Sequence, residues 1–104
     1  MNYKMFIDDE RDPVIHDYVV CRSSKEAIEY MKINGCPSFI SFDHDLGGDD
    51  TAMKVVNWMI EYSLDHPYWF NKDFNYYVHS QNPIGKLAID SKMDNFIHFM
   101  TYHD

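Results

Sequence analysis

Three short apolar stretches of the chain each run directly into a cluster of polar residues, and this limits the possible folds more than any other feature. The stretches are residues 3–7, 38–42 and 75–78, and the clusters begin at Asp8, Asp43 and His79. Residues 17–22 are rich in β-branched and aromatic residues and form a fourth predicted strand. Because helical patterns separate most of these strands, we predict an α/β fold with a mostly parallel sheet and right-handed crossovers.

Two helices are predicted between the strands. The first follows a capping box, with Ser23 as the N-cap and Glu26 at the third helical position. The second is predicted from about residue 51 to 64, because its apolar residues recur at helical spacing. Either Asp49 or Asp50 is expected to cap it.

A third helix is predicted over roughly residues 84–100, after the last strand. Asn82 is its expected N-cap, and Pro83 suits the first helical position. The N–H groups at the start of this helix would attract an anion through their partial positive charge.

Length and charge restrict the partners. The 104 residues suit one domain, which we expect to span residues 1–104. The formal net charge of -8 would repel a long phosphate backbone, so no extended duplex nucleic acid is expected as a partner. No membrane span and no signal peptide are predicted, which favours a cytoplasmic location. We expect a monomer or weak homodimer that binds a small phosphorylated ligand or an RNA end.

The acidic residues at the strand ends are the first candidates for chemistry. In a parallel sheet the carboxyl ends of the strands meet at one edge, which would gather Asp8, Asp9, Asp43 and Asp45. Such carboxylates repel one another unless they are protonated or bridged by a cation. Hard oxygen ligands suit Mg²⁺, so we predict a magnesium site held by these four residues. The alternative is that they are solvated loop acids.

His79 and Ser80 are the next candidates. A histidine at a strand end can move a proton near neutral pH, so we predict a catalytic role for His79 beside Asp43. The alternative is a structural histidine that caps the turn. His44 is a weaker catalytic candidate, because its side chain can equally point away from the pocket.

The predicted substrate-binding residues are Arg11, Ser80, Asn82 and Lys86. Arg11 can hold a phosphate with a two-pronged hydrogen bond, and Lys86 can add a point charge. An ordinary surface salt bridge is the alternative for each of these two cations.

Three segments together resemble a known family. FIDDERDP at 6–13, SFDHDLGG at 41–48 and VHSQNPIG at 78–85 are similar to motifs of the cyclic-phosphate-processing receiver-like family, a divergent branch of the response-regulator receiver domain. The resemblance implies a reduced receiver-like (flavodoxin-like) three-layer sandwich with a four-stranded sheet in the order 2-1-3-4. It also implies that Asp8 and Asp9 match the metal-holding acid pair, that Asp43 matches the phosphoacceptor, and that His79 replaces the switch Ser/Thr. The lysine of a receiver's fifth strand has no counterpart.

Three functions remain open from the sequence. The first is hydrolysis of cyclic phosphates, such as 2′,3′-cyclic ends of RNA or nucleotides, with a Mg²⁺-binding acidic cluster and a histidine acid/base. The second is a non-catalytic module that binds a cyclic nucleotide or a protein partner. The third is a signalling receiver that accepts phosphate on Asp43. The many Asn, Lys, Tyr and Asp residues are typical of an AT-rich genome and are compatible with a phage origin.

Overall fold

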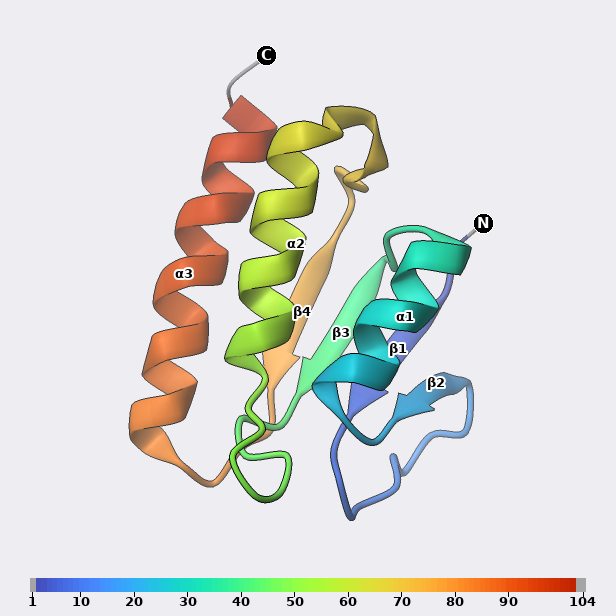
Figure 1. Cartoon of the computed structure of the whole chain (residues 1–104), viewed down its shortest axis with the longest axis vertical. Coiled ribbons are helices and arrows are strands. Elements are labelled where there is room, and N and C mark those ends of the chain that lie inside the picture. The colour runs from blue at the N-terminus through green and yellow to red at the C-terminus, as the bar shows by residue number, and fades with distance from the viewer. Residues whose placement is uncertain (1, 103–104) are drawn as a thin grey trace.

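Four short strands form one sheet in the order β2-β1-β3-β4, and every neighbouring pair is parallel (Figure 1). The computed structural model describes residues 2–102. The strands are β1 (Lys4–Ile7), β2 (Tyr18–Cys21), β3 (Phe39–Phe42) and β4 (Asn75–Val78). The α/β class, the strand order and the parallel direction predicted from the sequence are therefore confirmed.

Three α-helices cover the sheet on one side (Figure 1). They are α1 (Ser24–Asn34), α2 (Met53–Asp65) and α3 (Pro83–Tyr102), and a short 3₁₀ turn, η1 (Pro67–Trp69), follows α2. Within the described residues there is no helix with the length and apolar character that a bilayer crossing requires.

We expected a three-layer sandwich, whereas the described helices form a single layer. Side chains that point toward the helices, such as Ile7 and Phe42, are fully buried in the main core, whereas Tyr77 on the opposite face is 60% exposed. The crossovers β2-α1-β3 and β3-α2-β4 advance across the sheet in the same direction, so right-handed connections place both helices on one face. Residues 8–17 connect β1 to β2 without a helix, which leaves the other face without a covering layer.

Two of the predicted helix N-caps are confirmed by the structure, and one is wrong. Ser23 accepts a hydrogen bond from the Glu26 N–H at 3.1 Å, so the predicted cap of α1 is confirmed. Helix α2 begins after Ala52 with no side-chain cap, so the expected capping by Asp49 or Asp50 is wrong. Asp50 instead accepts from the backbone N–H and the hydroxyl of Ser24, at 2.8 and 2.5 Å, because the loop before α2 lies beside the start of α1.

This link leads to a prediction for Asp50→Ala, which should lower the free energy of unfolding by about 1–2 kcal/mol at neutral pH. Burial acts to raise the pKa of Asp50, but hydrogen bonds from Ser24 and the charge of Lys54 outweigh it and hold that pKa below its ordinary value. Because its pKa is lowered in the folded state, Asp50 makes its full contribution to the free energy of unfolding at neutral pH. This contribution is lost as the pH falls below about 4, where an unfolded aspartate takes up its proton.

Urea denaturation of wild type and Asp50→Ala at pH 7 and pH 3 measures this difference. The difference in free energy of unfolding between wild type and Asp50→Ala should be smaller at pH 3 than at pH 7. Asp49→Ala is the control, because Asp49 is an exposed neighbour on the same loop. If the difference in free energy of unfolding is the same at both pH values, the ionised form of Asp50 is not the source of the stabilisation.

The two cysteines, Cys21 and Cys36, lie in the core as free thiols. Burial raises the pKa of Cys21 to about 12 and the pKa of Cys36 to about 11. Because the thiolate is the reactive form, we expect both thiols to react with Ellman's reagent far more slowly in the native protein than in urea. Rapid labelling of the native protein at pH 8 would show that one of them is accessible.

Candidate functional site

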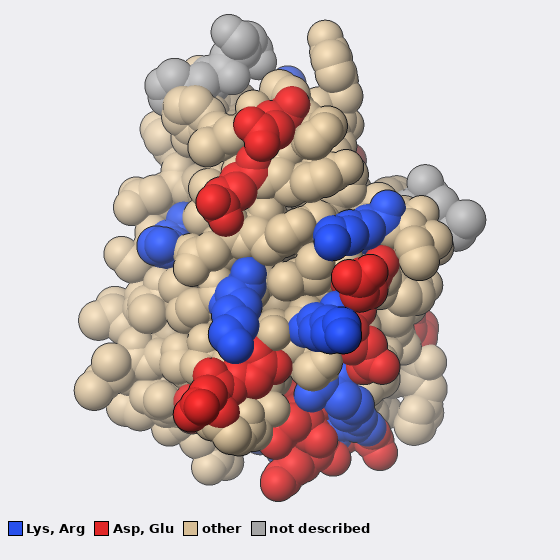
Figure 2. All heavy atoms as spheres, viewed as in Figure 1, with Lys and Arg blue, Asp and Glu red and all other residues tan. Residues whose placement is uncertain are grey.

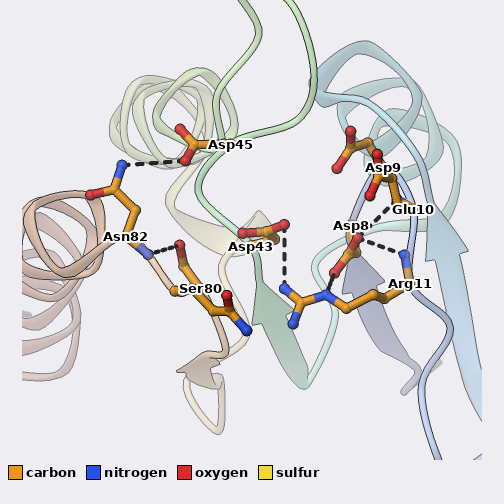
Figure 3. A pocket seen from close by; sticks show the side chains of 9 residues that line it. Asp8, Asp9, Glu10, Arg11, Asp43, Asp45, Ser80 and Asn82 are labelled. Atoms are coloured by element: carbon orange, nitrogen blue, oxygen red, sulfur yellow. Dashed lines mark hydrogen bonds and ion pairs between the residues drawn. The ribbon is translucent and has the colours of Figure 1, made fainter.

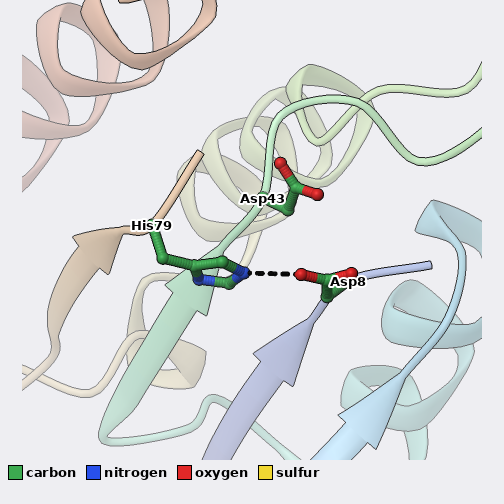
Figure 4. A group of neighbouring side chains, drawn as sticks. All are labelled: Asp8, Asp43 and His79. Atoms are coloured by element: carbon green, nitrogen blue, oxygen red, sulfur yellow. Dashed lines mark hydrogen bonds and ion pairs between the residues drawn. The ribbon is translucent and has the colours of Figure 1, made fainter. Parts of the chain in front are cut away.

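Three polar side chains from three strand ends meet at one edge of the sheet (Figure 4). Asp8 follows β1, Asp43 follows β3 and His79 follows β4, and one possible ligand atom of each lies within 4.8 Å of the others. Nε2 of His79 lies 3.0 Å from Oδ2 of Asp8. The structure thus brings together three of the residues that the sequence singled out.

Asp8 lies at the centre of this group, and its side chain is almost fully buried. Its Oδ1 accepts hydrogen bonds from the backbone N–H groups of Glu10 and Arg11, at 2.9 and 2.8 Å, and its Oδ2 accepts from Arg11 and His79. Burial acts to raise the pKa of Asp8, but these hydrogen bonds and the Arg11 charge outweigh it, so the pKa lies below its ordinary value. Asp8 is therefore a carboxylate at neutral pH.

Arg11 connects two of the carboxylates (Figure 3). Its Nε donates to Oδ2 of Asp8 at 2.9 Å, and its Nη2 lies 3.5 Å from Oδ2 of Asp43. The Asp43 side chain is largely buried, while the Arg11 side chain is 47% exposed. The guanidinium thus supplies the positive charge that lets two carboxylates lie side by side.

His79 is held on three sides. Its Nδ1 lies 2.7 Å from Oγ of Ser41, its Nε2 contacts Asp8, and its ring stacks on Phe6 with 4.6 Å between the ring centroids. A carboxylate can only accept a hydrogen bond, so in the neutral ring the proton belongs on Nε2 and the Ser41 hydroxyl donates to Nδ1. Packing and hydrogen bonding therefore fix the orientation of the imidazole.

Asp8, Arg11 and Asp43 form part of the wall of an open polar pocket of about 540 Å³ (Figure 3), and His79 lies behind this wall, in contact with Asp8. The lining residues are Asp8, Asp9, Glu10, Arg11, Asp43, Asp45, Ser80, Gln81 and Asn82. Acidic side chains gather at the end of the molecule where the strands finish, with basic side chains among them (Figure 2). A pocket of this size admits a nucleotide-sized ligand, but an anion needs positive charge to offset the acids.

Asp9 and Asp45 line the pocket but lie outside the three-residue group. Asp9 faces Gly47, where an added Cβ would lie 3.2 Å from its Oδ2; Gly47 also has a φ of +88°, which favours glycine. Asp45 contacts Nδ1 of His44 at 2.9 Å and accepts from Nδ2 of Asn82 at 3.3 Å, and these two hydrogen bonds lower its pKa.

Asn82 caps α3 as predicted. Its Oδ1 accepts from the N–H groups of Ile84 and Gly85, at 3.1 and 3.0 Å. These two helix N–H groups, which we expected to attract an anion, are therefore already satisfied. Ser80 lines the pocket, and its hydroxyl accepts from the Asn82 N–H at 3.1 Å, so its proton remains able to donate to a ligand.

Two sequence candidates lie away from the pocket wall. The His44 ring lies against Gly85, where an added Cβ would come within 2.4 Å of its Cγ, and His44 is not among the lining residues. Lys86 forms an ion pair with Asp90 one helical turn along α3, at 2.9 Å. The structure gives neither residue a contact with the Asp8, Asp43 and His79 group.

Two residues that support the site were not predicted from the sequence. Ser41 fixes Nδ1 of His79, and Arg22 donates to the backbone carbonyls of Asp8 and Arg11, at 3.1 and 2.6 Å. Ser41 is the single polar residue of β3, and Arg22 directly follows β2. Two features of the sequence could have indicated them: a polar residue within a buried strand, and a cationic residue at a strand end.

The donor set fits a small divalent cation. Two carboxylates suit Mg²⁺ or Mn²⁺, and the imidazole also admits ions of the Zn²⁺ class. These residues therefore form a possible metal-binding group.

Comparison with known proteins identifies one family. The family model described as cyclic-phosphate processing receiver domain matches residues 3–95, which include all the strands and the residues of the pocket. No curated protein and no solved structure matches the chain.

Proposed function

The chain belongs to the cyclic-phosphate processing receiver domain family, and from this premise we propose that it hydrolyses a cyclic phosphate. The finer substrate class that we propose is a 2′,3′-cyclic phosphate, on a nucleotide or at an RNA end. The single observation that supports catalysis most strongly is the meeting of Asp8, Asp43 and His79 within 4.8 Å at a pocket.

The reaction requires a nucleophile, charge stabilisation and a proton for the leaving group. The oxygen of a water molecule forms a bond to phosphorus, one ring P–O bond breaks, and a proton from the water ends on the freed sugar oxygen. His79 is the proposed acid/base, since it contacts Asp8 of the pocket wall and its orientation is fixed by Ser41 and Phe6. Such a group needs this orientation to act on a bound phosphate.

The carboxylates are the proposed cation ligands. Asp8 and Asp43 would hold Mg²⁺ or a similar ion, and Asp9 and Asp45 line the same pocket. A bound divalent cation would stabilise negative charge on the phosphoryl oxygens. Arg11 and Ser80 are the proposed phosphate ligands from this chain, through the guanidinium and the hydroxyl.

One observation favours a second function, binding without turnover. Both ring nitrogens of His79 are already hydrogen-bonded, to Ser41 and Asp8, so neither is free to take a proton from water in this arrangement. The same pocket could then hold a cyclic nucleotide without opening its ring.

Phosphorus NMR separates the two functions. We expect 2′,3′-cyclic AMP, or an RNA oligomer with a 2′,3′-cyclic end, to give a phosphomonoester signal when incubated with the protein and Mg²⁺ or Mn²⁺. Unchanged substrate across a panel of 2′,3′- and 3′,5′-cyclic nucleotides would exclude the hydrolase. Calorimetric binding in that case would support the binding module.

A further inference from the structure

The hydrogen-bonding capacity of Asp8 is fully used. A carboxylate offers about four lone-pair positions. Two are taken by the backbone N–H groups of Glu10 and Arg11 on Oδ1, and two by Arg11 Nε and His79 Nε2 on Oδ2. A cation can therefore bind Asp8 only if one of these donors leaves, and the backbone donors belong to the turn itself.

Arg11 is the donor that can leave. Its side chain is 47% exposed, while the His79 side chain is only 15% exposed and is also held by Ser41 and by stacking on Phe6. The Arg11 guanidinium also reaches Asp43, so it contacts both carboxylates that a cation would use. A guanidinium and a divalent cation on the same oxygen atoms would repel each other.

A released Arg11 has a clear second partner. Its guanidinium is the one cationic group among the described residues that line the pocket, and the opposite wall carries Ser80. A guanidinium binds a phosphate through two parallel hydrogen bonds. Positive charge freed from the acids would thus become available to the anion in the same pocket.

We propose that Arg11 is a switching counter-ion: it neutralises Asp8 and Asp43 in the metal-free site and turns to the phosphate when a divalent cation takes these carboxylates. Metal and phosphate then bind with positive coupling, and the metal-free site is a weak anion binder. The identity of the anion rests on the proposed function, but the competition between Arg11 and the cation does not.

The first test measures Mn²⁺ binding to wild type and Arg11→Gln, with free Mn²⁺ followed by electron paramagnetic resonance and no substrate present. Arg11→Gln should bind Mn²⁺ about tenfold more tightly, within the usual range for coupled binding, because no cation has to be displaced. Lys54→Gln removes the same charge from α2 and should leave the affinity unchanged. Unchanged or weaker binding by Arg11→Gln, or no binding by either protein, would overturn the proposal.

The second test separates displacement from a general charge effect. In ¹⁵N NMR spectra of wild type, the Nε–H signal of Arg11 should be protected from exchange and should lose that protection when Mg²⁺ is added. A signal that stays protected at saturating Mg²⁺ contradicts the switch. With Mg²⁺ saturating, inorganic phosphate should bind Arg11→Gln about tenfold more weakly than wild type.

These readouts distinguish the two proposals. If cyclic phosphates are not hydrolysed but Arg11→Gln gains Mn²⁺ affinity, the proposed hydrolysis fails and the counter-ion switch survives. If hydrolysis occurs while Arg11 does not compete with Mn²⁺, the counter-ion switch is wrong and the proposed hydrolysis stands. Arg11→Lys keeps the charge, so it should bind Mn²⁺ much as wild type does and serves as a second control. If Arg11→Gln is unstable by circular dichroism, the loss of Nε–H protection in wild type on addition of Mg²⁺ still tests the switch.

Discussion

His79→Gln is expected to reduce turnover of a 2′,3′-cyclic nucleotide by about 100-fold or more, the usual contribution of a positioned acid–base group. Glutamine preserves hydrogen bonding toward Asp8 or Ser41 but does not exchange a proton near neutral pH. The loss should therefore appear mainly in kcat, while binding of the product phosphomonoester changes little. Steady-state kinetics monitored by chromatography of the nucleotide products give both values.

His44→Gln is the matched control for this prediction. His44 directly follows Asp43 in sequence, but its ring lies against Gly85 and does not line the pocket. Its replacement should leave kcat within about twofold of wild type, as for residues away from the reacting groups. Equal losses in the two variants would mean that the imidazole of His79 has no special role in proton transfer. Circular dichroism melts exclude unfolding as the cause.

The convergence of Asp8, Asp43 and His79 could be predicted because it follows from strand register alone. Ile7 pairs with Phe42, and Phe42 pairs with Val78. In a parallel sheet the residue after each register partner lies at the same edge, so three sequence clusters became one spatial cluster. The cap by Asn82 was predictable for a similar reason, since it depends only on the next three residues.

The remaining features depend on contacts between distant segments. Asp50 precedes α2 in sequence, yet it binds Ser24 because of how the loop lies against α1. Lys86 forms an ion pair with Asp90 on the same helix and therefore does not line the pocket. The resemblance to a larger fold predicted three layers. The strand order and the helix-free connection between β1 and β2 instead lead to a single layer of helices.

Gly85→Ala is expected to destabilise the protein by about 1–3 kcal/mol, the usual cost of overfilling a packed site. The added Cβ would lie 2.4, 2.7 and 2.8 Å from Cγ, Cδ2 and Cβ of His44. These are atoms near the base of the side chain, so a rotation of the ring cannot relieve all of the clash. Thermal denaturation should show a fall in Tm of about 10 °C for a domain of this size.

His44→Ala should weaken this effect without abolishing it. The ring atoms Cγ and Cδ2 are then absent, but the Cβ at position 44 still lies 2.8 Å from the added Cβ at position 85, so part of the clash remains. A double-mutant cycle therefore yields a large coupling between the two positions, while Leu87→Ala, at an exposed site on the same helix, should not couple to His44. If Gly85→Ala is equally destabilising in both backgrounds, the contact between His44 and Gly85 is not what requires glycine. A large coupling would instead assign His44 to the packing of the loop after β3 against the start of α3.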